Sequence, residues 1–418
     1  IIYKYFLNYK TMKKITLLLF IFLSINLSAK QTLTGIEVLK ASNFKILEGK
    51  RVGLITNPTG VDRNLKSTID ILFEAKNVKL VALFGPEHGV RGDIYAGDKV
   101  ENATDPKTGL PVYSLYGKTR KATPEMLKDI DVLVYDIQDI GCRSFTFISS
   151  MGLAMEAAAE NDIEFVILDR PNPLGGEKME GNLTEMPFTS FVSQFKIPYL
   201  YAQTCGELAW MLNEENMLKK KCKLTVVKMK NWHRNMKWEQ TGLEWVVASP
   251  HIPHKHSPYF YPITGILGEL GYVSIGVGYT LPFQVIGAPW INAEQLTNKL
   301  NNLNLEGLVF RPIFFKPFYA TYKDENCQGV EIHISSFKKA KLSDVQFHIM
   351  QVINELYPDK AVFNNANKDR FNMFDKVCGS DQIRLLFSKN NSFADIKDYW
   401  YKDVEHYKKI SKKYYLYK

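Results

Sequence analysis

The chain has 418 residues, of which 45% are hydrophobic and 23% charged, and its formal net charge is +9 at pH 7. Lysine and arginine are scattered along it, which argues against the concentrated basic face of a nucleic-acid-binding protein. After residue 29 no stretch reaches the roughly 20 apolar residues that a membrane-spanning helix needs. The length exceeds one comfortable hydrophobic core, so we expect two domains.

Residues 1–29 have the pattern of an export signal. Lys13 and Lys14 precede an apolar stretch over residues 15–25, and the segment ends in small residues at Ala29. We expect translation to start at Met12 and the signal to be cleaved after Ala29, leaving a periplasmic protein without stable membrane insertion. Without residues 1–29 the chain lacks four lysines and no acid, so the formal net charge falls from +9 to +5.

Residues 30–245 alternate short β-branched runs with helical segments. Strands are predicted at residues 51–56, 78–84, 132–136, 163–168 and 224–229, and helices at 67–75, 124–129, 145–160 and 206–215. Such alternation predicts an α/β domain with a mostly parallel sheet that is covered on both faces.

The residue composition changes near Trp245, and proline-rich aromatic loops are predicted after it, over residues 249–253 and 257–262. We place a domain boundary there. Residues 246–418 then form a smaller α+β domain, with strands predicted at 309–315 and 329–335 and helices at 343–356 and within 393–413. The five cysteines lie far apart without a C-x-x-C pair, so we expect most of them to be buried small apolar residues.

Polar clusters follow four of the apolar runs, at residues 57–60, 85–89, 136–143 and 169–173. Ligands bind outside the carboxyl ends of an open parallel sheet, so these clusters predict one cleft. Ordinary turn chemistry is the alternative for each cluster taken alone. The candidate site residues are Asn57, Glu87, His88, Arg91, Asp136, Gln138, Asp139, Arg143, Asp169, Arg170 and Asn172.

These side chains, mixed with tyrosine and tryptophan, are suited to sugar hydroxyls and ring faces. Glycoside hydrolysis needs a proton donor and a second carboxylate that acts as base or nucleophile. Glu87 lies on a glycine-punctuated turn and is the predicted donor, with Asp139 or Asp136 as its partner. Asp136 has an equally good structural interpretation, in which it ties down a loop through backbone amides.

No metal or organic cofactor is predicted. His251, His254 and His256 lie among prolines without matching acidic or cysteine partners, so we interpret them as a loop patch. The segment Gly276-Val277-Gly278 lacks the strand, the third glycine and the following acid of a dinucleotide site. Glu207 fits a helix capping box better than a catalytic role.

Long motifs carry a family resemblance from about residue 34 to the end. They are Gly85-Pro86-Glu87-His88-Gly89-Val90-Arg91-Gly92, Thr108-Gly109-Leu110-Pro111-Val112-Tyr113-Ser114-Leu115-Tyr116-Gly117, Tyr135-Asp136-Ile137-Gln138-Asp139-Ile140-Gly141-Cys142-Arg143, Leu168-Asp169-Arg170-Pro171-Asn172-Pro173-Leu174-Gly175-Gly176, Gly287-Ala288-Pro289-Trp290 and Tyr415-Leu416-Tyr417. With them the chain resembles the exo-β-N-acetylmuramidase family, the NamZ-type enzymes long described as a domain of unknown function.

The resemblance implies a Rossmann-like N-terminal domain and an interdomain cleft that binds peptidoglycan sugar. Enzymes of this family release N-acetylmuramic acid from the non-reducing end of glycan fragments, and their proposed catalytic glutamate falls on Glu87. The lactyl group of muramic acid is a carboxylate, onto which Arg91, Arg143 or Arg170 could fork. The chain departs from the family pattern at residues 200–203, 249–251 and 276–278, which indicates a different glycan preference.

Two other functions compete with this hypothesis. A two-domain cleft also suits a non-catalytic muropeptide or sugar-binding protein of the periplasm. A metal-dependent hydrolase built from Glu87, His88, Asp136 and Asp169 is the third interpretation, which requires adjacent residues to reach one ion from a single turn.

Overall fold

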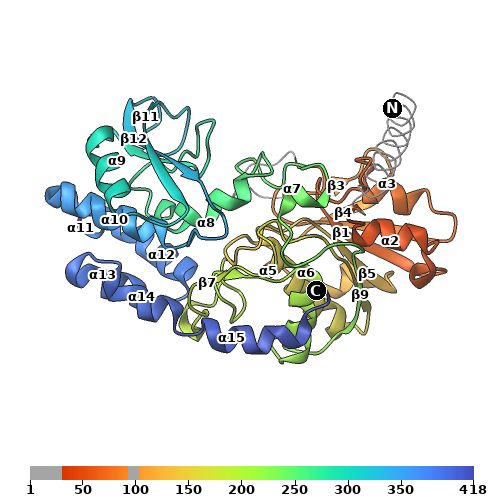
Figure 1. Ribbon diagram of the computed structural model, residues 1–418. Coiled ribbons are helices and arrows are strands. Elements are labelled where there is room, and N and C mark those ends of the chain that lie inside the picture. Colours follow the sequence, from red (N-terminus) through yellow and green to blue (C-terminus); the bar gives the residue numbers. More distant parts are fainter. Residues whose placement is uncertain (1–30, 93–102) are drawn as a thin grey trace, which may run out of the picture.

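The computed structural model describes residues 31–92 and 103–418. The predicted export signal, residues 1–29, lies outside the described residues. Figure 1 shows an N-terminal lobe around a large sheet and a C-terminal lobe around a small one, with the chain ending back against the N-terminal lobe.

The N-terminal lobe contains a seven-stranded sheet in the order β3-β4-β2-β1-β5-β6-β9. All neighbouring strands are parallel except the short edge pair β3–β4. The strands are β1 (Arg51–Thr56), β2 (Lys79–Gly85), β3 (Ala103–Thr104), β4 (Pro111–Ser114), β5 (Val132–Asp136), β6 (Glu164–Leu168) and β9 (Lys223–Val227). The predicted α/β class is confirmed, whereas β3 and β4 were not predicted.

Helices cover both faces of this sheet because successive strand residues point to opposite sides. In β5, Val132 and Val134 join one buried apolar cluster, and Leu133 and Tyr135 join the other. Apolar residues of α2 and α3 complete the first cluster and those of α5 the second. The helices of this lobe are α2 (Gly35–Ala41), α3 (Thr68–Phe73), α4 (Pro124–Leu127), α5 (Phe147–Glu160), α6 (Cys205–Glu214) and α7 (Trp238–Thr241).

The C-terminal lobe is built on an antiparallel sheet in the order β10-β12-β11. Its strands are β10 (Val285–Ala288), β11 (Leu308–Phe315) and β12 (Cys327–Ile334). Its helices are α8 (Ser257–Gly268), α9 (Ala293–Asn302), α10 (Val345–Leu356), α11 (Val362–Asn365), α12 (Phe371–Cys378), α13 (Gln382–Asn390), α14 (Ala394–Tyr401) and α15 (Val404–Ser411). The predicted strands, the helix at 343–356 and the helices within 393–413 are confirmed.

Shorter elements connect these parts. A two-stranded ribbon pairs β7 (Met179–Glu180) with β8 (Leu200–Tyr201). Single 3-10 turns are η1 (Lys45–Leu47), η2 (Met186–Phe188), η3 (Pro358–Lys360), η4 (Lys368–Arg370) and η5 (Lys412–Tyr414).

Helix α8 contradicts the loop predicted over residues 257–262. Pro258 lies in its first turn, where a missing N–H is harmless, but Pro262 lies inside the helix. Almost every residue of α8 is buried. Gln346 of α10 makes three hydrogen bonds to it, accepting from the N–H groups of Ile266 at 2.9 Å and Leu267 at 3.2 Å and donating to the Pro262 carbonyl at 3.2 Å. Tertiary packing therefore outweighs the helix-breaking character of the prolines.

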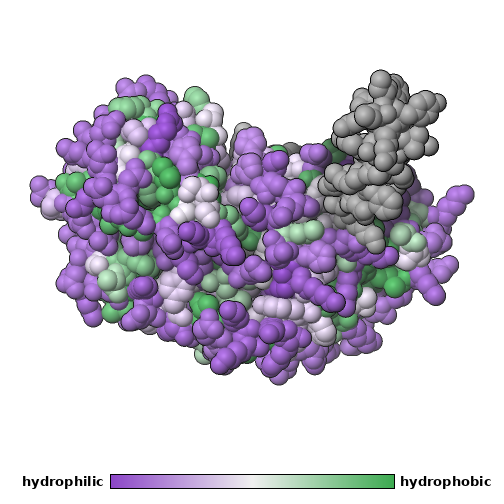
Figure 2. Space-filling model, viewed as in Figure 1, coloured by the Kyte–Doolittle hydropathy of each residue, from purple (hydrophilic) through white to green (hydrophobic). Residues whose placement is uncertain are grey.

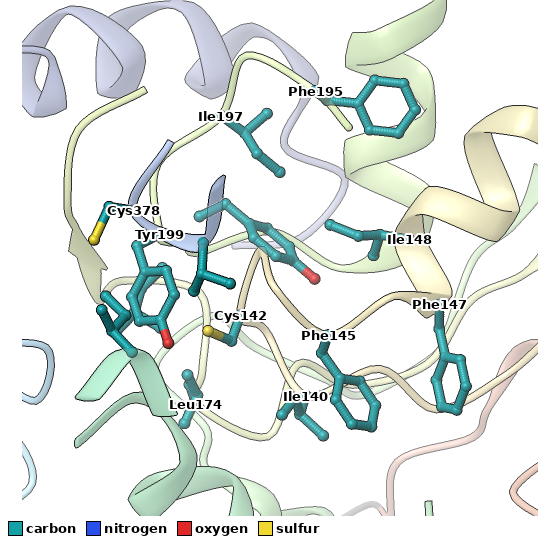
Figure 3. Packing of buried hydrophobic residues seen from close by; sticks show 14 of the residues in the cluster. Ile140, Cys142, Phe145, Phe147, Ile148, Leu174, Phe195, Ile197, Tyr199 and Cys378 are labelled. Carbon is teal, nitrogen blue, oxygen red and sulfur yellow. The ribbon is translucent and has the colours of Figure 1, made fainter. Parts of the chain in front are cut away.

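The two lobes interlock through buried contacts. Arg143, which is fully buried, donates to the carbonyls of Ile197 at 2.7 Å and of Cys378, on α12, at 2.8 Å. Figure 3 shows Cys142, Tyr199 and Cys378 in one buried apolar cluster, and the Arg143 guanidinium lies 5.9 Å from the centre of the Tyr199 ring. All five cysteines are free and buried, as predicted.

The polypeptide ends against the N-terminal lobe. After α15, the Leu416 N–H donates to Glu207 at 2.8 Å and the Tyr417 hydroxyl donates to Asp169 at 2.5 Å. On the face shown in Figure 2, hydrophilic residues predominate and hydrophobic ones form small separate groups. Among the described residues, no helix has the length and apolar character to cross a membrane.

Candidate active site

A cavity of about 750 Å³ lies between the two lobes. Glu87, His88, Tyr116 and Thr146 line it from the N-terminal lobe, and α8 and the segments after it line the opposite side. This volume lies within the range of small-molecule sites. The cavity is therefore a candidate site for ligand binding near the carboxyl end of β2.

Glu87 reaches the cavity from the turn after β2. His88 and Gly89 both have φ of +73°, a left-handed conformation that a buried histidine rarely adopts. The Thr146 hydroxyl donates to Glu87 Oε2 at 2.7 Å. Burial, together with the charge of Glu87 and a hydrogen bond to it, raises the pKa of the Tyr116 hydroxyl to about 12. The turn thus presents a carboxylate that neighbouring hydroxyls orient.

The carboxyl ends of β1, β5 and β6, in contrast, are filled by the protein's own side chains. Asp136 is fully buried and pairs with Arg170, whose Nε donates at 2.5 Å and whose Nη2 donates at 3.0 Å. Thr68 adds a hydroxyl donor at 2.5 Å. A space of only about 20 Å³, lined by Arg170 and its neighbours, remains there.

The other predicted polar residues of this edge also have structural partners. Asn57 Oδ1 accepts from the backbone N–H of Thr59 at 3.0 Å, and Asn172 Oδ1 accepts from that of Leu174 at 2.9 Å. Gln138 donates to the carbonyl of Pro171 at 2.7 Å. None of Asn57, Gln138 and Asn172 lines the large cavity.

Asp139 and Asp169 are buried carboxyls with several donors each. Asp139 Oδ2 accepts from the Gly141 N–H at 2.7 Å and from the Tyr201 hydroxyl. Asp169 accepts from the Gly206 N–H at 2.8 Å. Burial raises the pKa of Asp139 to about 7 and that of Asp169 to about 6, against the lowering effect of these hydrogen bonds. Neither carboxyl lines the cavity.

One arginine among Arg91, Arg143 and Arg170 was predicted to contact a ligand carboxylate. Arg143 and Arg170 are buried and bonded to the protein itself, and Arg91 donates to Asp105 at 2.7 and 2.9 Å. The arginines that line the cavity are instead Arg120 and Arg370, and Lys376 lies with them.

Several cavity residues escaped the sequence analysis. They are Tyr116, Arg120, Thr146, Tyr261, Glu269, Arg370 and Lys376. Tyr116 falls within a motif quoted above, and Thr146 follows the 136–143 cluster, so both had a local signal. Tyr261, Glu269, Arg370 and Lys376 had none, because only the packing of the C-terminal lobe brings α8, η4 and α12 to the cavity.

The histidines of the predicted loop patch, His251 and His256 among them, have different surroundings in the structure. His251 lines the cavity and bonds through Nε2 to the Tyr319 hydroxyl at 2.7 Å, whereas His256 pairs with Glu239. Burial and the nearby His88 lower the pKa of His251. In the described part of the chain, no three His, Cys, Asp or Glu side chains are grouped so that they could hold a metal ion.

Comparison with known proteins identifies the family of the chain. A family model described as "Exo-beta-N-acetylmuramidase NamZ, N-terminal" matches residues 52–256, and its C-terminal counterpart matches residues 259–417. The chain belongs to the NamZ exo-β-N-acetylmuramidase family. This confirms the resemblance found in the motifs.

Relatives of this NamZ family member match over nearly their whole length. "Peptidoglycan beta-N-acetylmuramidase NamZ" of Bacillus subtilis (strain 168) is 44% identical over 384 residues, which are 92% of this chain and 91% of that protein. Crystal structures of two DUF1343 family proteins from Bacteroides fragilis NCTC 9343 are also similar. One is 66% identical with a TM-score of 0.90 and the other 31% identical with a TM-score of 0.73, and each match covers 93% of this chain and 99% of the solved chain.

Proposed function

We propose that the protein is an exo-acting glycoside hydrolase that releases N-acetylmuramic acid from the non-reducing end of peptidoglycan fragments, with Glu87 as the proton donor. One observation carries the role of Glu87: it is the carboxyl that β2 delivers to the wall of the interlobe cavity. Membership of the NamZ family supports the substrate class.

The cavity suits a sugar acid. Its volume of about 750 Å³ is sufficient for a monosaccharide with its substituents, and aromatic rings at Phe145, Tyr261 and Phe283 line it. Arg120, Arg370 and Lys376 add positive charge for the lactyl carboxylate of muramic acid. In hydrolysis, the oxygen of the departing sugar takes a proton from Glu87 while its bond to the anomeric carbon breaks.

The test replaces Glu87 by glutamine and measures turnover of a muramic acid disaccharide. We expect turnover to fall by roughly 10²- to 10⁴-fold, the usual contribution of a positioned general acid. The matched control is Glu306→Gln, at a glutamate whose side chain is 75% exposed outside the cavity. Unchanged turnover in Glu87→Gln contradicts its role as donor.

The same preparation separates the enzyme from the sugar-binding alternative. If calorimetry detects binding of the disaccharide to the unaltered protein but no product forms after long incubation, the protein is a binding protein.

We further propose that the protein is exported to the periplasm, because residues 12–29 have the pattern of an export signal. N-terminal sequencing of the mature protein tests this proposal.

A further inference from the structure

Within the described residues, two carboxylates line the interlobe cavity, and they come from opposite lobes. Glu87 follows β2 in the N-terminal lobe, and Glu269 follows the last residue of α8 in the C-terminal lobe. Asp136 and Asp139, the partners predicted for Glu87, are absent from this lining. Glycoside hydrolysis with two carboxyl groups needs both to face the same sugar, so Glu269 meets a condition that the two aspartates do not.

The surroundings of Glu269 differ from those of a structural acid. It is half-buried, yet no hydrogen bond or ion pair joins its carboxylate to another described residue. The nearest cation, Arg370, donates through Nε to the backbone carbonyl of Glu269 at 2.8 Å. Burial raises the pKa of Glu269, and the charge of Arg370 opposes that rise. Burying a carboxylate without hydrogen-bond partners is unfavourable. The contacts of Glu269 within the protein therefore do not explain why a glutamate occupies this position.

Tyr261, on α8, lines the cavity together with both carboxylates. Its hydroxyl is 3.1 Å from the Ser144 hydroxyl of the N-terminal lobe. Burial raises the pKa of Tyr261 well above its usual value, and the charges of Glu269 and Glu87 both add to the rise. A sugar bound in this cavity therefore has carboxylates from both lobes on its walls.

We propose that Glu269 is the second catalytic carboxylate, acting on the anomeric carbon from the side opposite to Glu87. This rests on the proposed hydrolase function. In a single displacement, a water oxygen bonds to the anomeric carbon and passes its proton to Glu269. In a double displacement, Glu269 itself forms an ester with that carbon, which water then hydrolyses. Either way the glycosidic bond breaks, and the departing oxygen takes its proton from Glu87.

The experiment compares Glu269→Gln and Glu269→Ala with Glu306→Gln on a para-nitrophenyl N-acetylmuramide and on a muramic acid disaccharide. We expect both Glu269 variants to lose at least about a hundredfold in turnover on both substrates. The nitrophenolate leaves without a proton, so Glu87→Gln loses less on the aryl substrate. Sodium azide, small enough for the space left by Glu269→Ala, is expected to restore turnover and give the α-glycosyl azide.

Three outcomes overturn the assignment of Glu269. The first is turnover in Glu269→Gln that matches turnover in the Glu306→Gln control. The second is a loss of turnover in the Glu269 variants on the disaccharide but not on the aryl substrate. The third is that azide forms no α-glycosyl azide with Glu269→Ala. Thermal unfolding checks that the variants fold, and calorimetry with N-acetylmuramic acid checks that the cavity still binds. If the unaltered protein and the control turn over neither substrate, the proposed function fails instead.

Discussion

The carboxylates at the sheet edge and those that line the interlobe cavity differ in their hydrogen-bond partners. Asp136, Asp139 and Asp169 lie at or just after strand ends, as an active site in an α/β fold requires, and each accepts hydrogen bonds from its own chain. Glu269 has no such partner among the described residues, and Glu87 is oriented by hydroxyls on the cavity wall. Position at the sheet edge therefore does not by itself place a carboxylate at the cavity wall.

The largest effect on stability is expected at Asp136. Replacing it by asparagine leaves the Arg170 guanidinium buried without its counter-charge, which destabilises a protein by about 3–5 kcal/mol. The exposed Asp129, 3.3 Å from Arg51, is the control, and Asp129→Asn should change the unfolding free energy by at most about 1 kcal/mol. Urea unfolding measures both. Equal losses of unfolding free energy in the two variants would contradict a stabilising role for the buried Asp136–Arg170 pair.

A pH dependence is expected from Asp139. The pKa of Asp139 rises from 3.8 in the unfolded chain to about 7 in the folded protein. Its favourable contribution to the free energy of unfolding is therefore complete below pH 3.8 and is lost as the pH rises through 7. The slope reaches at most about 1.4 kcal/mol per pH unit. Asp139→Asn keeps an oxygen for Gly141 and Tyr201 and should remove this slope. Unfolding of both proteins between pH 4 and pH 8 checks it, and parallel curves would contradict a raised pKa.

The smallest effect concerns the cations of the cavity. Arg370→Met removes a positive charge from the wall, and we expect the KM for an N-acetylmuramide to rise about tenfold, in line with a charge-assisted contact. For the matching N-acetylglucosaminide, which lacks the lactyl carboxylate, KM should not change. Steady-state kinetics on the two substrates give the comparison. An equal rise for both sugars would show that Arg370 supports the fold of the cavity rather than reading the carboxylate.

The parts of the fold that were predictable are those governed by local pattern. Continuous apolar runs such as residues 132–136 become buried parallel strands, and alternation with helices specifies the sheet class. The edge pair β3–β4 is too short to give a periodic signal. Helix α8 was mistaken for loops because two prolines suggest a break, whereas burial against α10 holds the helix together.

The candidate site divides in the same way. Glu87 was found because it lies on a glycine-containing turn directly after a strand, so its place in the cavity follows from local sequence. Glu269 and Arg370 are separated from Glu87 by more than 180 residues, and neither belongs to a recognisable motif. Arg143 and Arg170 looked like ligand-binding arginines because a sequence does not show that carbonyls and a carboxylate of the same chain already occupy them.

The sequence alone determined the sheet class, the family and the turn that carries Glu87, because hydrophobic periodicity and glycine-containing turns act over a few residues. The tertiary structure alone decided which of the polar strand-end residues line the interlobe cavity. That choice depends on the docking of α8 and α12 against the N-terminal lobe, which opens a cavity beside Glu87 while Arg170 fills the neighbouring strand ends. Hydrogen bonds between residues far apart in the chain hold the strand-end acids inside the fold, and local sequence does not encode these bonds.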